Sequence, residues 1–475
     1  MVGVSPRRPV RTDRSKGRPR TVLVVAVIGL LLAGNCSSDR GADPSGGLGG
    51  GIEAAAEVAS PAPGDFGDLV GVCGPNEGGG AVPDAGPDEV QGVTEDTITL
   101  GTVADPGFEG RPGLNQEIFD TAEAFVAWCN AAGGINGKQL ELNLHDAAVT
   151  EYQPVMAEAC GQDFAIVGSG AVQDNFWAST GAACGLVDIA GFSVTPEKAG
   201  LAGQDPIEAR SIQPVPNAGD RFQAGAFLLV GETAPDAQDR AGIVYGDLET
   251  LIVRKDQAVD ALEQVGFTFV HEASYNLLGE SNWGLFAAAL SQDQVRFLHY
   301  VGEGENFALL TQAMDEVGYR PELMLMETNL YDQGWVEAAG DAADGVFVRT
   351  VFWPFEEADQ NPATQQYLDL IEAQGGKVAQ LGVQAMSAWL LFAQAARDCD
   401  RADDLTRTCL LEAAASTTAW TGGGLHAPTE PGSNEPTPCT IVLQVQEGEF
   451  TRFAPAEGYD CGEASDQPYV VGVDA

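Results

Sequence analysis

Hydrophobic and polar residues follow a helical pattern over residues 115–130. Apolar side chains recur there at the three- and four-residue spacing of one helix face, at Phe119, Ala122, Phe125, Val126 and Cys129. Residues 139–145 instead alternate between polar and apolar side chains, which is the period of a strand with one buried face. Residues 133–137, Gly-Gly-Ile-Asn-Gly, lie between the two patterns, and glycine tolerates the positive φ that ends a helix. The stretch therefore predicts a helix, a glycine-rich turn and a strand.

Strand and helix patterns alternate from Thr97 onward. The first unit contains strands at 98–103, 139–145, 164–168 and 186–190, and helices at 115–130, 152–161 and 174–184. Because a single helix between successive strands requires a crossover connection, we expect a parallel sheet covered on both faces.

The pattern restarts at Ala241 as a second unit of similar size. Its strands are predicted at 241–245, 267–270, 295–298 and 323–326, and its helices at 252–265, 282–291 and 306–317. A strand at 345–350, helices at 362–374 and 382–398, and a hairpin of 440–445 with 450–453 follow. The expected fold class is α/β, with two doubly wound parallel-sheet lobes.

The N-terminus has the pattern of an export signal. Residues 1–20 carry seven basic side chains and one acid, and an apolar run follows over residues 22–33. That run is shorter than the roughly 20 residues that span a bilayer, but it matches the hydrophobic region of a secretory signal. It ends in Leu-Ala-Gly-Asn-Cys, which resembles a bacterial lipobox that would lipidate Cys36, although Asn35 stands where that pattern prefers Gly or Ala. An uncleaved anchor gives the same topology, so we expect the body outside the cytoplasm.

Two segments follow the predicted signal peptide of residues 1–35. Residues 36–63 are rich in Gly, Ala, Ser and Pro, which predicts a flexible tether because such a segment cannot bury a core. Residues 64–95 are still rich in glycine and proline, and we expect an ordered lead-in pinned by Cys73.

The charge of the chain disfavours nucleic-acid partners. The sequence holds 24 basic and 69 acidic residues, and without residues 1–35 it holds 17 and 68, a net charge of −51. Such an acidic surface repels phosphate backbones and anionic lipid headgroups. The ordinary interpretation is a solvated surface that keeps an exported protein in solution.

Eight cysteines remain if Cys36 carries lipid. They are Cys73, Cys129, Cys160, Cys184, Cys399, Cys409, Cys439 and Cys461. An even number outside the cytoplasm indicates four disulfides, whereas zinc is disfavoured because the chain has no CxxC pair and its four histidines are scattered. Connectivity stays open, although Cys399–Cys409 and Cys439–Cys461 are close enough in sequence to pair locally.

Motifs for catalysis and cofactor binding do not appear. The serine of Gly168-Ser169-Gly170 lacks the outer glycines of a nucleophile elbow. Neither a phosphate-binding G-x-x-x-x-G-K-[ST] motif nor HExxH occurs, and no dinucleotide fingerprint follows the first strand. The sequence predicts no enzyme, no cofactor and no metal site.

The helix–glycine–strand run at Cys129–Lys138 resembles that of the branched-chain amino-acid type of solute-binding proteins in ABC importers. The similarity extends over roughly residues 96–455. It implies a type I periplasmic-binding-protein-like fold whose lobes are joined by a hinge that the chain crosses several times. In this arrangement lobe 1 is 96–212, lobe 2 is 213–345, residues 346–438 return to lobe 1, and 439–475 form a hairpin and tail against lobe 2.

The ligand is expected in the cleft at the carboxyl ends of the strands of both lobes. Backbone donors of Ala171, Val172 and Gln173 form one candidate anion site. The resemblance places a ligand-binding serine where this chain has Val172, so the hydroxyl is missing. The alternative is an ordinary strand–helix loop.

A second ligand loop is expected at residues 191–197. The resemblance carries Ser193, Val194 and Thr195 over without a gap, and Thr195 could bond a ligand carboxylate through its N–H and its hydroxyl. The alternative role for Thr195 is to cap the helix that begins at Pro196.

The remaining ligand contacts are implied by the resemblance. Glu280 of lobe 2 corresponds to the acid that binds a ligand ammonium group, and a surface glutamate is the alternative. Tyr245 lies at a family aromatic position, although the aromatic–glycine pair expected after it is replaced. Leu114 aligns near the aromatic residue of the first loop, with Phe108 and Arg111 nearby. These departures argue against a simple aliphatic amino acid.

The resulting expectation is a monomeric, lipid-anchored protein on the outer face of the cell membrane. It would capture a small polar solute, an amino acid, amide or related compound, and deliver it to the permease subunits of an ABC importer. The alternative is a ligand-binding sensor that signals to a membrane receptor or kinase.

Overall fold

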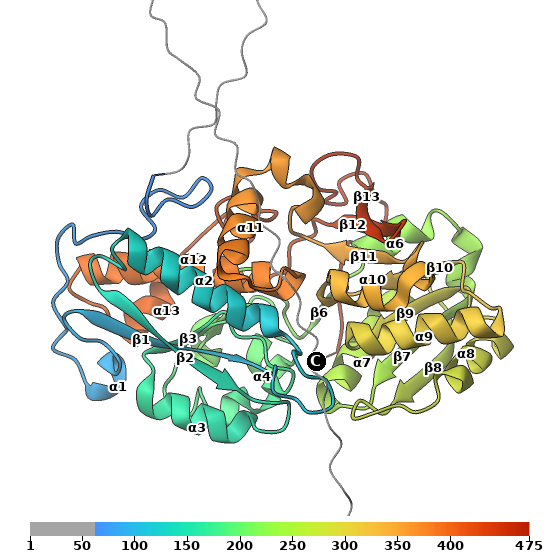
Figure 1. The fold of residues 1–475 in the computed structure, drawn as a ribbon, viewed down its shortest axis with the longest axis horizontal. Helices are drawn as coiled ribbons and strands as arrows, with labels where there is room; N and C mark the ends of the chain where they lie inside the picture. Colours follow the sequence, from blue (N-terminus) through green and yellow to red (C-terminus); the bar gives the residue numbers. More distant parts are fainter. Residues whose placement is uncertain (1–61, 475) are drawn as a thin grey trace, which may run out of the picture. The chain divides into compact units, whose positions relative to one another are not determined.

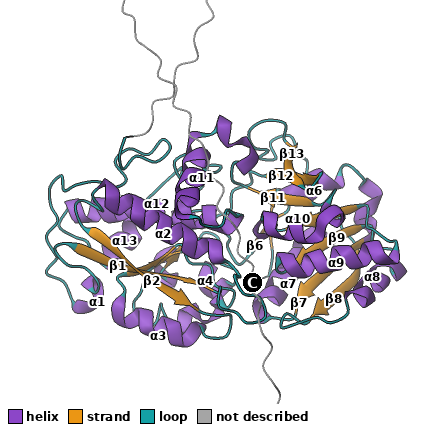
Figure 2. Ribbon diagram, in the orientation of Figure 1, coloured by secondary structure: helices purple, strands orange, loops and turns teal. Residues whose placement is uncertain are grey.

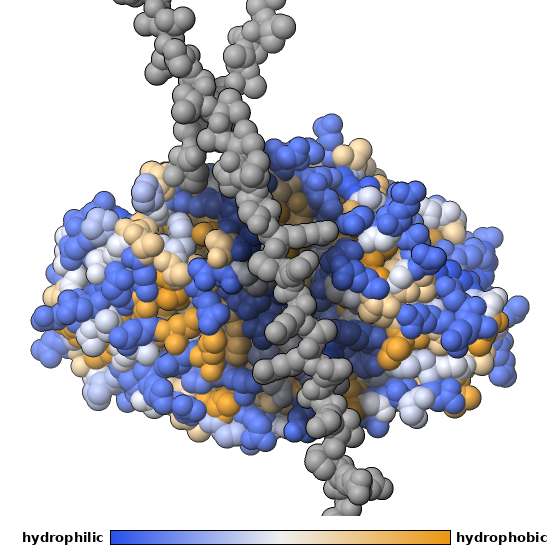
Figure 3. All heavy atoms as spheres, viewed as in Figure 1, coloured by the Kyte–Doolittle hydropathy of each residue, from blue (hydrophilic) through white to orange (hydrophobic). Residues whose placement is uncertain are grey.

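A computed structural model describes residues 62–474, which form two lobes around separate sheets (Figure 1). The predicted signal peptide, Cys36 and nearly all of the predicted tether lie outside the described residues. Within the described range, none of the helices combines the length and hydrophobicity that a membrane span requires. The face drawn in Figure 3 is covered mainly by hydrophilic side chains, as the high acidic content suggests.

Lobe 1 is built on a five-stranded, fully parallel sheet in the order β2-β1-β3-β4-β5 (Figure 2). Its strands are β1 Thr97–Ala104, β2 Gln139–Asp146, β3 Ala165–Val167, β4 Asp188–Ile189 and β5 Ser211–Ile212. One face packs on α2 (Gln116–Ala132) and α12 (Gln380–Arg401), where the ring of Phe125 stacks on Trp389 at 5.2 Å. The opposite face packs on Met156 of α3 (Tyr152–Gln162) and on Trp177 of the 3-10 helix Asp174–Ser179.

Lobe 2 contains a seven-stranded sheet in the order β13-β12-β11-β10-β9-β7-β8. The parallel strands are β7 Ala241–Gly246, β8 Phe269–Tyr275, β9 Phe297–Val301, β10 Leu323–Met326 and β11 Phe347–Thr350. The antiparallel hairpin of β12 (Ile441–Gln446) and β13 (Glu449–Ala454) extends the sheet at β11. One face packs on α6 (Gly225–Gly231) and α7 (Glu249–Gln264). The other packs on α8 (Trp283–Gln292), α9 (Gly304–Val317) and α10 (Gln333–Ala339).

The chain passes between the lobes at residues 213–220, 351–361 and 434–440. The return to lobe 1 was expected at residue 346, but β11 pairs with β10 and β12, so residues 347–350 belong to lobe 2. After the second crossing, α11 (Pro362–Gln374), α12 and α13 (Arg407–Ala415) pack on lobe 1. The C-terminal strand β14 (Val470–Gly472) pairs with β6 (Arg221–Gln223), and Val471 joins the core of lobe 2.

The glycine-rich turn after α2 has the predicted geometry. Gly133 and Gly134 adopt φ values of 116° and 79°, and their N–H groups bond the carbonyls of Asn130 and Cys129. Asn136 and Gly137 also have positive φ and lead into β2. The helix is therefore capped by the residue type that this conformation favours.

Some predicted elements differ from the structure. The helix predicted at 174–184 is a short 3-10 helix, Asp174–Ser179, because the Trp177 ring packs where a side chain at Gly181 would lie and the chain turns beneath it. The strand expected at 186–190 pairs only at Asp188–Ile189. Short helices occur at α1 Pro87–Val90, α4 Pro196–Ala199 and α5 Pro206–Ala209.

Four disulfides connect the eight cysteines that the sequence singled out. The local pairs Cys399–Cys409 and Cys439–Cys461 are confirmed, and the other two are Cys73–Cys129 and Cys160–Cys184. The lead-in at residues 64–95 packs on lobe 1, where Phe66 and Val72 are buried in its core and Cys73 is bonded to α2.

Candidate functional site

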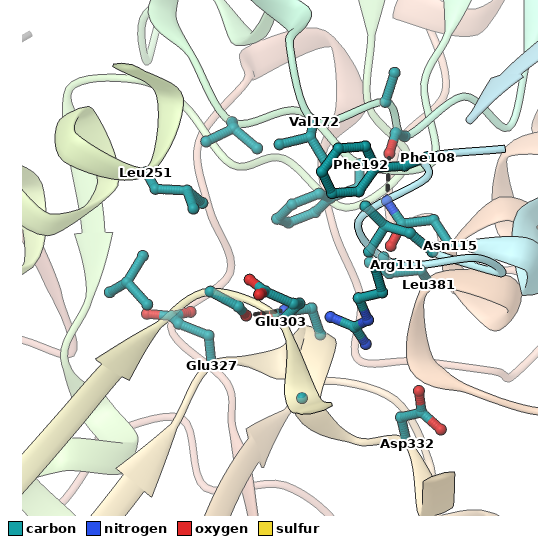
Figure 4. A pocket seen from close by; sticks show the side chains of 18 of the residues that line it. Phe108, Arg111, Asn115, Val172, Phe192, Leu251, Glu303, Glu327, Asp332 and Leu381 are labelled. Atoms are coloured by element: carbon teal, nitrogen blue, oxygen red, sulfur yellow. Dashed lines mark hydrogen bonds between the residues drawn. The ribbon is translucent and has the colours of Figure 1, made fainter. Parts of the chain in front are cut away.

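A cavity of about 110 Å³ lies between the lobes (Figure 4). It is bounded by the segments that follow β1, β3 and β4 of lobe 1 and those that follow β8, β9 and β10 of lobe 2. The carboxyl ends of both parallel sheets therefore face one space, which is where open α/β sheets bind ligands.

One side of the cavity is apolar. Most of its side chains come from lobe 1, and Figure 4 shows the rings of Phe108 and Phe192 together beside Val172. The apolar lining consists of Phe108, Leu114, Ala171, Val172, Phe192, Val194, Leu251, Leu277, Val301 and Leu381. A bound molecule would gain free energy by placing apolar surface against this wall.

Arg111 projects from the loop after β1 toward the lobe 2 side of the cavity. Its side chain is 14% exposed and forms an ion pair with Glu305, the second residue of α9. Its Nε and Nη1 atoms are buried and have no hydrogen-bond partner within residues 62–474. Burial lowers the pKa of Arg111 to about 10, so the side chain remains a cation at neutral pH.

Glu303 presents a carboxylate to the cavity from lobe 2, two residues beyond β9. It is 9% exposed and accepts hydrogen bonds from the Tyr275 hydroxyl at 2.7 Å and from Asn306. The Tyr300 hydroxyl donates in turn to Tyr275 at 2.8 Å. These donors are neutral, and Glu303 forms no ion pair with a lysine or arginine of the described chain. Because buried carboxylates are normally paired, Glu303 is a candidate partner for a cationic or N–H group.

Glu327, the first residue after β10, forms ion pairs with cationic side chains of lobe 2. Arg254 and Arg349 approach it at 3.2 and 3.0 Å, and His299 lies at 3.5 Å. Burial alone would raise the pKa of Glu327, but Arg254 and Arg349 hold it well below its usual range. This charge is therefore balanced within the protein.

Lys377, in the loop before α12, joins the two lobes at the edge of the cavity. Its Nζ lies 3.1 Å from Glu117 of α2 and 2.7 Å from Asp332 of lobe 2. Burial raises the pKa of Glu117, whereas the two carboxylates raise that of Lys377 against the effect of burial. The pairing of Lys377 spans both lobes.

The predicted anion site at the end of β3 already holds a carboxylate of the protein. Asp105, the residue after β1, accepts the N–H of Val172 at 2.7 Å and that of Val149 at 2.6 Å. Val149 has a φ of 63°, which is unfavourable for a β-branched residue, and the bond from Asp105 helps to hold it. Burial raises the pKa of Asp105 to about 6, although both N–H groups act against that shift.

The loop after β4 is held in the same way by Asp174. This fully buried side chain accepts the N–H of Val194 at 2.6 Å and the Thr195 hydroxyl at 2.8 Å. The Thr195 N–H is directed to the same carboxylate at 3.2 Å. Burial raises the pKa of Asp174 to about 6, against the opposing effect of nearby Lys198.

The structure brings half of the ten predicted ligand-binding residues together in the cavity lining: Phe108, Leu114, Ala171, Val172 and Val194. The other half lies outside that lining: Gln173, Ser193, Thr195, Tyr245 and Glu280. Thr195 is buried against Asp174, and its side chain makes no capping bond to α4. Tyr245 lies beneath Lys255 at 5.3 Å. Glu280 accepts the N–H groups of Ser281 and Asn282, so its carboxylate closes a local turn before α8.

Glu303 was not identified from the sequence, and Arg111 was noted only as a neighbour. A signal for Glu303 was present, because it lies two residues after the fully buried run of β9 and so at the ligand-binding edge of the sheet. No group of three or more potential metal ligands clusters in the described range.

A sequence profile described as periplasmic binding protein matches residues 113–449. The chain belongs to this family, whose members act outside the cytoplasm as binding proteins. No curated protein sequence matches the chain.

Solved structures share the fold. A fatty acid ABC transporter substrate-binding protein from Thermomonospora curvata has a TM-score of 0.66 and 19% identity, covering 83% of this chain and 100% of that one. A leucine-binding protein from Thermotoga maritima has a TM-score of 0.61 and 16% identity, covering 75% and 98%. A branched-chain amino acid transporter substrate-binding protein from Streptococcus pneumoniae, in complex with isoleucine, has a TM-score of 0.59 and 14% identity, again covering 75% and 98%. The expected two-lobed α/β fold of this type is confirmed.

Proposed function

We propose that the protein is the solute-binding component of an ABC importer, held on the outer face of the membrane by lipid at Cys36. It captures a small solute, an amino acid, amide or related compound, between its lobes and delivers it as a monomer to the permease. No catalytic step is part of this function.

One observation carries the proposal: the cavity is walled by both lobes and contains charged groups directed to the same space from opposite sides. Arg111 comes from lobe 1 and Glu303 from lobe 2. Hinge closure around a solute would exclude water and strengthen contacts to both groups. Family membership supports the same function, as do the solved relatives that are described as parts of ABC transporters.

Contacts to the solute are proposed from the five predicted residues in the lining. Phe108, Leu114 and Val172 would contact its apolar part, and Ala171 and Val194 would shape the floor beside them.

Calorimetry tests the binding function directly. The chain without residues 1–35, and with Cys36→Ser to prevent lipidation, is titrated with amino acids, amides, ureas and small carboxylates. One compound should bind at one site per chain and reduce the radius of gyration measured by X-ray scattering. If no compound binds or raises the melting temperature, the proposed function is wrong.

The anchor has a separate test in cells. The natural chain should incorporate labelled fatty acid and remain with the membrane fraction, whereas Cys36→Ala should not be labelled. Equal labelling of the two chains would rule out Cys36 as the attachment point.

A further inference from the structure

Three of the main-chain donors at the ends of β3 and β4 are already engaged by the protein. Asp105 accepts the N–H of Val172, and Asp174 accepts those of Val194 and Thr195. Both carboxylates are fully buried. A ligand anion at this position would meet two carboxylates of like charge and would have to displace them from their donors. These three donors are therefore not available to an anionic group of the solute, which favours a cation of the cavity as its partner.

Arg111 differs from the other cations of the cavity in how it is paired. Arg254 shares the buried Glu327 with Arg349, and Lys377 lies between two carboxylates. Arg111 instead pairs with Glu305, whose side chain is 54% exposed. An ion pair with so exposed a partner contributes little free energy and is readily exchanged.

The guanidinium of Arg111 also has unused hydrogen-bonding capacity. Its Nε and Nη1 atoms are buried without a partner in the described chain, which is costly for a charged group. A carboxylate accepts two parallel hydrogen bonds from one edge of a planar guanidinium, either from Nε and Nη2 or from Nη1 and Nη2. Because Nη2 is the atom that pairs with Glu305, a second carboxylate that uses either edge has to replace Glu305. The rings of Phe108 and Phe192 line the same cavity, and the guanidinium points away from them toward Glu303 (Figure 4).

We propose that Arg111 binds the carboxylate of the solute in exchange for Glu305, and that the solute is a short carboxylic acid with an apolar body. This proposal rests on the proposed function and names the substrate class and the residue that selects it. The apolar body lies against Phe108, Phe192 and Leu251, on the side of the cavity away from the charged groups.

The size of the cavity limits the length of that body. A volume of about 110 Å³ is somewhat smaller than the engineered apolar cavities of about 150 Å³ that accept benzene. The apolar part should therefore contain roughly four to seven carbon atoms.

The test uses the chain without residues 1–35, with Cys36→Ser, and four probes of one shape. 4-Methylpentanoate and leucine carry the carboxylate, and 4-methylpentanamide and leucinamide lack it. Calorimetry should detect binding of both acids. Each amide should bind roughly 10- to 150-fold more weakly than the corresponding acid. Arg111→Gln should weaken the acids by a similar factor and leave the amides unchanged, whereas Arg111→Lys should recover only part of the affinity.

Two further variants separate binding from folding. Glu305→Gln removes the competing carboxylate and should tighten the acids by roughly two- to fivefold, the opposite direction to Arg111→Gln. Arg320→Gln is the matched control, because Arg320 pairs with Asp315 on the surface of lobe 2, away from the cavity. Arg111→Gln should keep or raise the melting temperature, since it removes a buried cation with unpaired donors.

The outcomes distinguish this proposal from the proposed function. Equal binding of acids and amides, or unchanged binding of acids by Arg111→Gln, overturns the role of Arg111 and leaves solute binding intact. Selective binding of amides or amines overturns the substrate class in the same way. If none of the wider panel binds, both proposals fail.

Discussion

The carboxylate of Asp105 lies 2.7 Å from the backbone nitrogen of Val172 and accepts its N–H. These residues follow neighbouring strands, β1 and β3, and meet at the edge of the sheet where a ligand anion was expected. The protein thereby supplies internally the negative charge that this site favours. Val172 has no side-chain hydroxyl to offer a ligand, and its N–H is already bonded to Asp105.

The acidity of Asp105 predicts a specific pH dependence of stability. Its pKa is raised to about 6 in the folded state, against roughly 3.9 in an unfolded chain. The folded protein therefore binds this proton more tightly, and the contribution of Asp105 to stability improves as pH falls from about 7 toward 4. Between pH 7.5 and 5, the free energy of unfolding of the wild type should gain about 1 kcal/mol relative to Asp105→Asn.

Urea unfolding at both pH values measures this difference. Asp174→Asn should behave in the same way, because burial also raises the pKa of Asp174 to about 6. The exposed Asp84→Asn serves as the control and should follow the wild type. Parallel pH profiles for Asp105→Asn and the wild type would contradict the prediction.

Glu303, rather than Glu280, is expected to meet an amino group of a solute. Glu303→Gln should weaken the binding of leucine by roughly 1.5–3 kcal/mol, the free energy of a charged hydrogen bond. It should leave 4-methylpentanoate nearly unchanged, because that acid has no ammonium group. Glu280→Gln should affect neither probe, since the Glu280 carboxylate bonds the N–H groups of Ser281 and Asn282. The reverse result in calorimetry would return the original assignment to Glu280.

Glu327 is expected to stabilise lobe 2 strongly. Glu327→Gln leaves Arg254 and Arg349 buried without their counter-charge, which should cost about 3 kcal/mol or more of unfolding free energy at pH 7. The surface pair of Arg296 and Glu322 provides the matched comparison, and Glu322→Gln should cost about 1 kcal/mol or less. Denaturant melts of the two variants should separate clearly, and equal losses would refute the distinction.

The disulfide between Cys73 and Cys129 is expected to hold the lead-in on lobe 1. The double variant Cys73→Ser/Cys129→Ser should lose about 2–4 kcal/mol of stability. Hydrogen exchange should rise over residues 64–95 more than elsewhere. The matched control is Cys439→Ser/Cys461→Ser, which opens a loop beside the β12–β13 hairpin of lobe 2. Unaltered exchange over residues 64–95 would show that packing alone retains the segment.

Local signals predicted much of the fold. The helix predicted at 362–374 has the same bounds in the structure, because Asn361 caps the N–H groups of Ala363 and Thr364 and Gly375 ends it with a φ of 69°. The small sheet of β6 and β14 was missed, since each strand has three residues and the partner lies at the far end of the chain. Short strands with distant partners leave little periodicity to detect.

The site was predictable in position but not in chemistry. Strand ends indicate where a ligand lies, and half of the predicted residues do line the cavity. Whether a backbone N–H is free depends on tertiary contacts, such as that between Val172 and Asp105, 67 residues apart. The sequence placed Arg111 near the first ligand loop. That two of its nitrogens are buried without a partner depends on the packing of both lobes around it.

The covalent link from Cys73 to α2 determines which half of the molecule would bear a mechanical load. The chain enters the body through a segment bonded and packed to lobe 1 alone, so force applied at the N-terminus is transmitted to that lobe. Under the proposed lipid attachment at Cys36, lobe 1 would stay fixed at the membrane and lobe 2 would move relative to it. When the cleft opens and releases the solute, lobe 2 would then turn relative to the transporter. The N-terminal attachment of lobe 1 would not have to move.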